Sequence, residues 1–296
     1  MFQIHLWTGL AIGLYIVMLS VSGSILVYNA EIVRFLEAPM PEFQPDREPM
    51  SVEEMTVAAE RAYPGYEVTR IGRRVTRRRP VMSVNLELGD DVRARVFNPY
   101  TGEDLGEAFP DSVRALFWVT ELHDDLLMGF NGRRINGIGS ALVTLLVLTG
   151  AVIWWPGRKR VRRSLSVKWK SRWPRFNWDL HSALGFWVYA LMLLWAVSGV
   201  YLAFPDPFQA VVDAVSNPDA ILGDRPGDVA LLWLTRLHFG RFRNYPALQA
   251  MWALLGLVPA VMFITGGVMW WNRFLRKASG APADETSGLR TSESSD

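Results

Sequence analysis

Histidine is the one residue type through which this chain could bind a transition metal strongly. The 296-residue sequence contains four histidines and no cysteine. Disulfides, thiolate haem ligation, iron–sulfur clusters and cysteine-type zinc sites are therefore excluded, which leaves imidazole as the obvious strong metal ligand. The four residues are His5, His123, His181 and His238. Whether they can act together depends on the elements that position them.

An internal repeat relates these histidines as two equivalent pairs. The sequence around His5 matches that around His181 at an offset of 176 residues, and a Ser-Gly dipeptide recurs further along both segments. The sequence around His123 matches that around His238 at an offset of 115, with six of nine residues identical. The offsets differ because the first repeat carries a long insertion. Chance is a poor explanation for four histidines at two pairs of equivalent positions.

Four long apolar blocks would carry these residues. Each block lacks Asp, Glu, Lys and Arg, and each is as long as the ~20 residues that a helix needs to cross a bilayer. The first block exceeds the roughly 7 to 15 apolar residues of a signal peptide and follows no basic segment, so we expect a retained span. The sequence thus predicts an all-α membrane protein, a bundle of four transmembrane helices built from two tandem helical hairpins. The blocks are Ile4–Tyr28, Ile135–Trp155, Leu180–Phe204 and Ala247–Trp271.

The distribution of charge predicts how the spans are oriented. Nine Lys and Arg residues and no acidic residue lie between Trp155 and Trp178, so the positive-inside rule places this segment in the cytoplasm. The last block also leads into a basic segment, Asn272–Lys277. We therefore expect both termini in the cytoplasm and the protein in a bacterial inner membrane. Two hairpins of the same orientation would be related by an axis along the membrane normal.

The insertion in the first repeat has the pattern of a small α+β domain on the periplasmic side. Residues 51–63 predict a helix with a capping box formed by Ser51 and Glu54. Short runs rich in β-formers predict strands at 67–71, 81–88 and 92–97. The expected organisation is span 1 at 1–30, the α+β domain at 31–112, an amphipathic helix and span 2 at 113–156, a basic loop at 157–178, span 3 at 179–205, a periplasmic loop with a short helix at 206–244, span 4 at 245–273 and a disordered tail at 274–296.

The repeat also predicts how the histidines meet. His5 and His181 begin spans near the cytoplasmic face, whereas His123 and His238 precede the spans that return inward, near the outer face. An axis along the membrane normal makes equivalent residues face one another. Two imidazoles on opposite sides of an iron are what a bis-histidine haem requires, so we expect each pair to hold one haem b through its iron.

Glycines and arginines complete the expected sites. Gly23 lies 18 residues beyond His5, on the same face of a straight helix, and Gly199 repeats this relation in the second half. These two would flank the outer haem, and Gly150 and Gly266 the inner haem, because a missing side chain lets a porphyrin approach the backbone. Arginine forks bind carboxylates well. The arginines expected at the haem propionates are Arg133, Arg134, Arg241 and Arg243.

A break is expected before the second span. One straight helix from His123 to Trp155 would be about 50 Å long, too long for a bilayer. The segment Gly129–Gly132 predicts the break, and residues 113–123 have the apolar spacing of a short amphipathic helix at the outer end of the bundle. Two other roles stay open for the histidines. They could be hydrogen-bonded packing residues, or they could bind zinc or copper, although two histidines are few for a closed metal site.

The same residues resemble a known family. The chain is similar over nearly its whole length to PepSY-associated transmembrane proteins, which include inner-membrane ferric-siderophore reductases. The resemblance rests on the His-x-x-x-Gly motifs at His5 and His181 and on the Leu-His dipeptides at His123 and His238. The inserted domain resembles a PepSY module through the segment Val96–Glu103. What the resemblance implies is electron transfer from the cytoplasm through two haems to an outside acceptor, such as a ferric siderophore or another ferric chelate.

Three classes of function compete. The first is a haem-dependent oxidoreductase for iron acquisition, and the second is a PepSY adaptor or regulator of a periplasmic partner. A transporter is disfavoured because the apolar blocks contain no Asp, Glu, Lys or Arg. The sequence has no Gly-x-Gly-x-x-Gly motif, so a separate cytoplasmic protein or a quinol would donate the electrons. The bilayer is an expected partner and nucleic acid is not. Six arginines between Arg70 and Arg79 could bind an anionic chelate or form a solvated hairpin.

Overall fold

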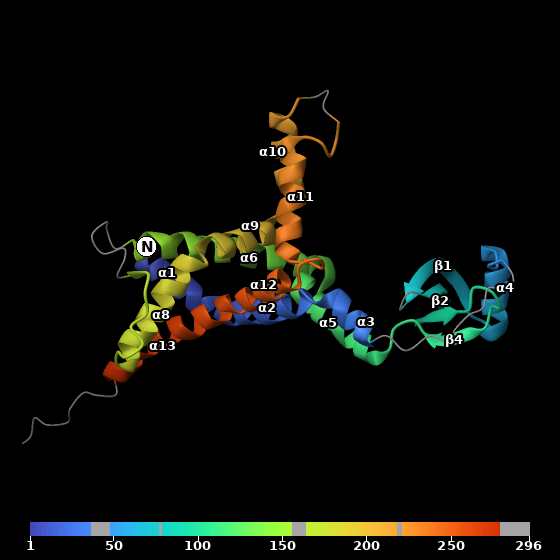
Figure 1. Cartoon of the computed structure of the whole chain (residues 1–296), viewed down its shortest axis with the longest axis horizontal. Helices are drawn as coiled ribbons and strands as arrows, with labels where there is room; N and C mark the ends of the chain where they lie inside the picture. Colours follow the sequence, from blue (N-terminus) through green and yellow to red (C-terminus); the bar gives the residue numbers. More distant parts are fainter. Residues whose placement is uncertain (37–47, 77–78, 156–163, 218–220, 279–296) are drawn as a thin grey trace, which may run out of the picture. The chain divides into compact units, whose positions relative to one another are not determined.

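The computed structural model describes residues 1–36, 48–76, 79–155, 164–217 and 221–278. These residues form two compact units. The bundle unit consists of Met1–Ser24 together with the chain from Phe130 onward, and the sheet unit consists of Ile25–Gly129. Figure 1 shows the elements of both.

The bundle unit contains two to four candidate membrane spans. α6 (Gly129–Trp154) is one continuous helix, and α12 (Pro246–Gly256) leads into α13 (Val258–Ala278). By length and composition, Gly129–Trp154 and Pro246–Arg273 can each cross a membrane. Two bent pairs also qualify if each pair counts as one span, which gives the expected four. These pairs are α1 (Phe2–Ala11) with α2 (Gly13–Leu26), and α8 (Trp173–Trp187) with α9 (Tyr189–Ala203).

Both bent pairs break at equivalent positions of the repeat. α1 and α2 meet at 62° around Ile12, and α8 and α9 meet at 64° around Val188. The ψ angles are 8° at Ile12 and 6° at Val188, whereas a regular helix has a ψ of about −42°, and this difference turns the chain. The expectation of a straight first span is therefore wrong. Because the break lies between His5 and Gly23, these two residues do not share one face of one helix.

The first half of each bent span is bonded to the continuous span of its own repeat, and α1 also packs against α13 of the other repeat. α1 meets α6 where the His5 ring bonds to the Leu146 carbonyl oxygen. α8 lies beside α13 (Figure 1), and the Asn177 side-chain amide donates a hydrogen bond of 2.8 Å to the Thr265 carbonyl oxygen. These contacts lie at the ends of the spans that the charge pattern predicts to be cytoplasmic.

The second half of each bent span packs against the continuous span of the other repeat. The Ser20 hydroxyl of α2 donates a hydrogen bond of 2.5 Å to the Gly256 carbonyl oxygen, at the end of α12. On α9, a Cβ atom added to Gly199 would lie 2.6 Å from the Ser140 hydroxyl of α6. Ser140 and Gly256 are equivalent residues, 116 positions apart. α2 also keeps a contact with α6 of its own repeat, because the Tyr15 hydroxyl donates a hydrogen bond to the Asn136 carbonyl oxygen. The second halves of the bent spans thus connect the two repeats.

A helical hairpin follows α9 directly. It consists of α10 (Pro205–Val215) and α11 (Pro226–Phe239), each with a proline in its first turn, where the missing N–H is not needed. Both helices run across the direction of α6 and α9 (Figure 1). Arg225 joins them, because its guanidinium forms ion pairs with Asp213 (2.8 Å) and Asp228 (2.7 Å).

The sheet unit contains a four-stranded antiparallel sheet with the strand order β1-β2-β3-β4. The three expected strands are confirmed in slightly longer form, and the fourth was not expected. The expected helix is confirmed as α4 (Val52–Ala62), with the capping box between Ser51 and Glu54 in place. The strands are β1 (Glu67–Thr76), β2 (Arg79–Leu88), β3 (Asp91–Phe97) and β4 (Asp104–Glu107).

The core of the sheet unit lies between α4 and one face of the sheet. Met55 and Ala59 of α4 are fully buried against Met82, Leu86 and Phe97. A smaller cluster of Val81, Val96 and Ala108 forms on the other face, because successive residues of a strand point to opposite sides.

Two further helices complete the sheet unit, α3 (Asn29–Leu36) and α5 (Asp111–Asp125). α5 confirms the short helix expected at 113–123. It ends where Leu126 and Leu127 adopt positive φ angles of 56° and 62°, followed by Gly129 at 56°. The break was expected at 129–132. The structure places it slightly earlier, and Gly132 lies buried inside α6.

Candidate functional site

His5 is held on α1 by two acceptors of α6. Its Nδ1 atom lies 3.0 Å from the Leu146 carbonyl oxygen and 3.3 Å from the Thr149 hydroxyl oxygen. A carbonyl oxygen can only accept, so Nδ1 must carry the proton. The Thr149 hydroxyl agrees with this assignment, because it donates its own proton to the carbonyl oxygens of Leu145 and Leu146.

His181 repeats this arrangement on α8 and α13. Its Nδ1 atom lies 2.8 Å from the hydroxyl oxygen of Thr265, the residue equivalent to Thr149. The Thr265 hydroxyl donates its proton to the carbonyl oxygens of Val261 (2.9 Å) and Met262 (3.0 Å). It must therefore accept from Nδ1–H of His181. Both rings keep their proton on Nδ1, and each Nε2 carries an unprotonated lone pair.

The two rings also share a second property. Among the described residues, neither Nε2 atom makes a hydrogen bond. A metal-bound histidine almost always donates its other ring N–H to an acceptor, as both rings do here. The described residues contain no group of three or more His, Asp or Glu side chains that could enclose a metal ion. Two imidazoles with unprotonated Nε2 atoms would be able to hold a haem iron, whereas a closed zinc site would need further ligands.

Gly150 and Gly266 make room for these rings. A Cβ atom added to Gly150 would lie 3.0 Å from Cε1 of His5, and one added to Gly266 would lie 3.4 Å from Cε1 of His181. The two glycines therefore lie at the expected depth. In the structure both glycines lie against a histidine ring, because each glycine directly follows the threonine that is hydrogen-bonded to that ring.

His238 lies on α11 and is bound by a serine of α9. Its Nδ1 atom is 2.6 Å from the Ser198 hydroxyl oxygen. Ser198 is fully buried and donates its proton to the carbonyl oxygens of Leu194 and Trp195. The hydroxyl consequently accepts from Nδ1–H of His238. This is the same tautomer, fixed in the same way, as at His5 and His181.

The sequence matches one protein-family model over most of its length. The model for the PepSY-associated TM region matches residues 2–228 and 216–273. The chain belongs to the PepSY-associated TM family. No curated protein matched the sequence.

The remaining expected residues of this PepSY-associated membrane protein are placed as follows. His123 lies on α5 in the sheet unit, so its pairing with His238 stays a prediction. Gly23 lies in α2, and Gly199 packs against Ser140 rather than against a histidine. Ser22 precedes Gly23 as Ser198 precedes Gly199, and its hydroxyl makes the same bond to the carbonyl oxygen four residues earlier.

The four arginines that are expected to bind haem propionates have exposed side chains in the bundle unit. Arg134 stacks over the Phe130 ring at 4.2 Å and Arg241 over the Phe239 ring at 4.7 Å. Arg133 and Arg243 are exposed as well. Within the described part of the chain, no ion pair is formed by these four guanidinium groups, so their charges are available to an anionic ligand.

Two features of the site were missed in the sequence. The hydroxyls of Thr149, Thr265 and Ser198 each precede a repeated glycine, and this Thr-Gly and Ser-Gly pattern was the available signal. The acidic character of the third span was also missed, although Asp179 is the first residue of the span expected at 179–205. α8 begins at Trp173, so Asp179 lies inside the bent candidate span, 5% exposed, with Arg175 at 2.9 Å. The spans therefore do contain an ionisable residue.

Proposed function

We propose that this PepSY-associated membrane protein is a di-haem b-type oxidoreductase that passes electrons across a bacterial inner membrane. The observation that carries the proposal is the duplicated histidine–hydroxyl arrangement. His5 and His181 are fixed in the tautomer that leaves the Nε2 lone pair free to bind a metal, and they lie on equivalent helices of one bundle. A packing role would not require the same tautomer at both positions.

The residues have separate tasks in this proposal. His5 and His181 would hold one haem, and His123 and His238 the other. Bound haem supplies a metal centre that accepts and releases one electron at a time. The protein keeps each ligand ring oriented through the hydroxyl behind it, and the apolar spans exclude water. Exposed arginines, including Arg133 and Arg241, would pair with propionates.

The direction of electron flow follows from the predicted topology. The basic loop places the His5 and His181 end at the cytoplasm, where a cytoplasmic protein or a quinol would donate electrons. The acceptor would be a ferric siderophore or another ferric chelate in the periplasm, as the family resemblance implies. Reduction releases iron from such chelates, so the protein would serve iron acquisition.

The arginine cluster gives limited support to an anionic acceptor. Arg74 is engaged in the fold, since it donates a hydrogen bond of 2.9 Å to the Ala108 carbonyl oxygen and lies 4.4 Å over the Phe109 ring. Arg70 and Arg73 are exposed on the edge strand β1. Arg77 and Arg78 lie outside the described residues. At most part of the cluster is thus available to a chelate.

A non-catalytic adaptor is the competing function, and one observation favours it. The PepSY-like insertion forms its own compact unit with its own core, as a recruitment or inhibitory module would. The same unit also carries His123, which an adaptor has no reason to keep at a position equivalent to His238.

The test is an optical spectrum with a pyridine haemochrome assay on detergent-purified protein from haem-replete cells. We expect a low-spin b-type spectrum and two haems per chain. Reoxidation of the reduced protein by a ferric chelate, followed by stopped flow, tests the acceptor. A colourless protein under these conditions contradicts the proposal and supports the adaptor.

A further inference from the structure

We propose that the α10–α11 hairpin lies in the membrane interface, with its open apolar groove filled by lipid acyl chains. This inference concerns a surface that has no part in the haem proposal. It rests on the groove, on the polar side of the same hairpin and on the connection to α9.

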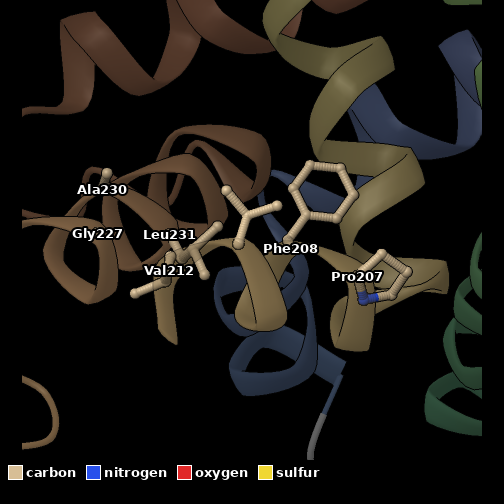
Figure 2. A pocket seen from close by; sticks show the side chains of 7 residues that line it. Pro207, Phe208, Val212, Gly227, Ala230 and Leu231 are labelled. Atoms are coloured by element: carbon tan, nitrogen blue, oxygen red, sulfur yellow. The ribbon is translucent and has the colours of Figure 1, made fainter. Parts of the chain in front are cut away.

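The groove runs between α10 and α11 and carries no polar side chain. Figure 2 shows the labelled side chains of both helices around it. Val212 is buried between the helices, whereas Val211 is 63% exposed. A ferric chelate or a charged peptide would find no hydrogen-bonding side chain here. The lining residues are Pro207, Phe208, Val211, Val212, Gly227, Ala230 and Leu231.

The opposite side of the hairpin is polar, and its polar side chains are hydrogen-bonded to one another. Gln209 donates to Asp213 (3.1 Å) and to Asp228 (3.2 Å), and Arg225 binds both aspartates. The hydrogen bonds from Arg225 hold the pKa of Asp228 well below its usual range. The polar side chains on one side of the hairpin thus bind one another, whereas the apolar side chains on the other side line an open groove.

The apolar side extends beyond the groove. Phe208, Val211 and Val215 recur at the spacing of one helical stripe, and Val215 is 77% exposed. Ile221 and Leu222, between the helices, are 72% and 78% exposed. An exposed apolar surface of this kind marks a contact with a partner or a membrane.

The connection to α9 selects the membrane as that partner. The candidate span ends at Ala203 and α10 begins at Pro205, so α10 starts where the chain leaves the hydrocarbon core. Both hairpin helices then run across the direction of the spans (Figure 1), as helices that lie in the plane of an interface do. Trp233 of α11, with the Arg236 guanidinium 5.5 Å from its ring, has the amphipathic character found at headgroup depth.

Single-cysteine labelling tests this directly, because the chain has no cysteine of its own. We would make Val211→Cys and Val215→Cys in the full chain, with Ala210→Cys, which is exposed and lies outside the apolar stripe of α10, as the matched control. Each variant is labelled with a nitroxide and reconstituted into vesicles of phosphatidylethanolamine and phosphatidylglycerol. The probes are collisions with oxygen, which partitions into lipid, and with a water-soluble nickel chelate.

We expect oxygen to exceed nickel in accessibility at positions 211 and 215, and the reverse at position 210. Nickel accessibility at 211 and 215 as high as at 210 would show a groove open to water and overturn the proposal. Exclusion of both probes from 211 and 215 would show a groove covered by protein and would overturn it equally. Because the measurement needs no haem, it can fail or succeed independently of the proposed electron transfer.

Discussion

His181 and His238 are bound by the same chemistry but on different supports. The acceptor of His181 is Thr265 on α13, and both helices belong to candidate spans. The acceptor of His238 is Ser198 in the span, but His238 itself lies outside the candidate spans, on α11, the helix that also lines the groove.

This difference concerns how firmly each imidazole is held in place. The helices of His5 and His181 are bonded to helices of the candidate spans, so their backbones move only if these helices separate. His238 can move with the α10–α11 hairpin, which is held by the Arg225 ion pairs and by its contacts with α9. We infer that the inner site is the rigid one and that the outer site responds to changes in the hairpin.

The largest effect is expected from removal of a ligand. His5→Ala and His181→Ala should each abolish the same haem component in a redox titration, and His123→Ala and His238→Ala should each abolish the other one. The reason is that one imidazole cannot replace a bis-histidine pair. If His5→Ala and His238→Ala remove one shared component, the pairing is wrong.

Gly240→Ala should disturb the outer site alone. Gly240 follows the helix of His238 with a φ of 60°, and an added Cβ would lie 2.0 Å from Cδ1 of Trp252. The strain of this backbone conformation costs about 1 to 3 kcal/mol in a non-glycine residue. We expect the absorption of the haem proposed at His123 and His238 to weaken or shift. The absorption of the haem proposed at His5 and His181 should not change.

Gly267→Ala is the matched control for this change. Gly267 lies next to the inner site, but an added Cβ would meet no atom within 4 Å, so both components should be retained. Equal damage by the two substitutions would mean that the outer site has no special dependence on its hairpin.

Thr265→Val should have a smaller effect, confined to the inner site. Without the hydroxyl acceptor, His181 is a weaker donor to iron, so the midpoint potential should become more positive and haem affinity should fall roughly tenfold. Thr149→Val should change less, because Nδ1 of His5 lies 3.3 Å from its threonine hydroxyl, whereas Nδ1 of His181 lies 2.8 Å from that of Thr265. Histidine ¹⁵N spectra of the haem-free protein should show loss of the pure Nδ1–H tautomer at residue 181.

Thr144→Val controls for the loss of a threonine from α6. Its hydroxyl makes the same kind of bond to a carbonyl oxygen four residues earlier, that of Ser140, without contacting a histidine. In this variant the haem midpoint potentials and the histidine tautomers should be the same as in the wild type. A tautomer at His181 that survives Thr265→Val unchanged would remove the threonine from the positioning role.

Mild acid should have the smallest effect. Hydrogen bonds from Arg225 hold the pKa of Asp228 below its usual range, so this group stabilises the folded hairpin fully above the ordinary aspartate pKa of about 3.9. That stability is lost only as the pH falls through the lowered pKa. The outer component should therefore persist in spectra from pH 7 down to about pH 5. Its selective loss in this range would show that other groups control the hairpin.

The repeat made the equivalence of the sites predictable, but not the atoms that hold them. His5 and Thr149 are 144 positions apart, and their contact depends on how α1 crosses α6. The bends at Ile12 and Val188 carried no signal, because neither residue is a glycine or a proline and both lie inside apolar runs. The strand Asp104–Glu107 was missed for a related reason, since four mostly polar residues show no alternation and join the sheet only through pairing with β3.

The contact between the repeats has a consequence for biogenesis. Ser20 of α2 bonds to Gly256 at the end of α12, which lies 236 residues later in the chain. The first hairpin, in which the Tyr15 hydroxyl already bonds to Asn136 of α6, must therefore wait in the bilayer until α12 has been synthesised. During this interval the polar hydroxyl of Ser20 has no partner from α12, and an insertase or chaperone that shields it would speed assembly.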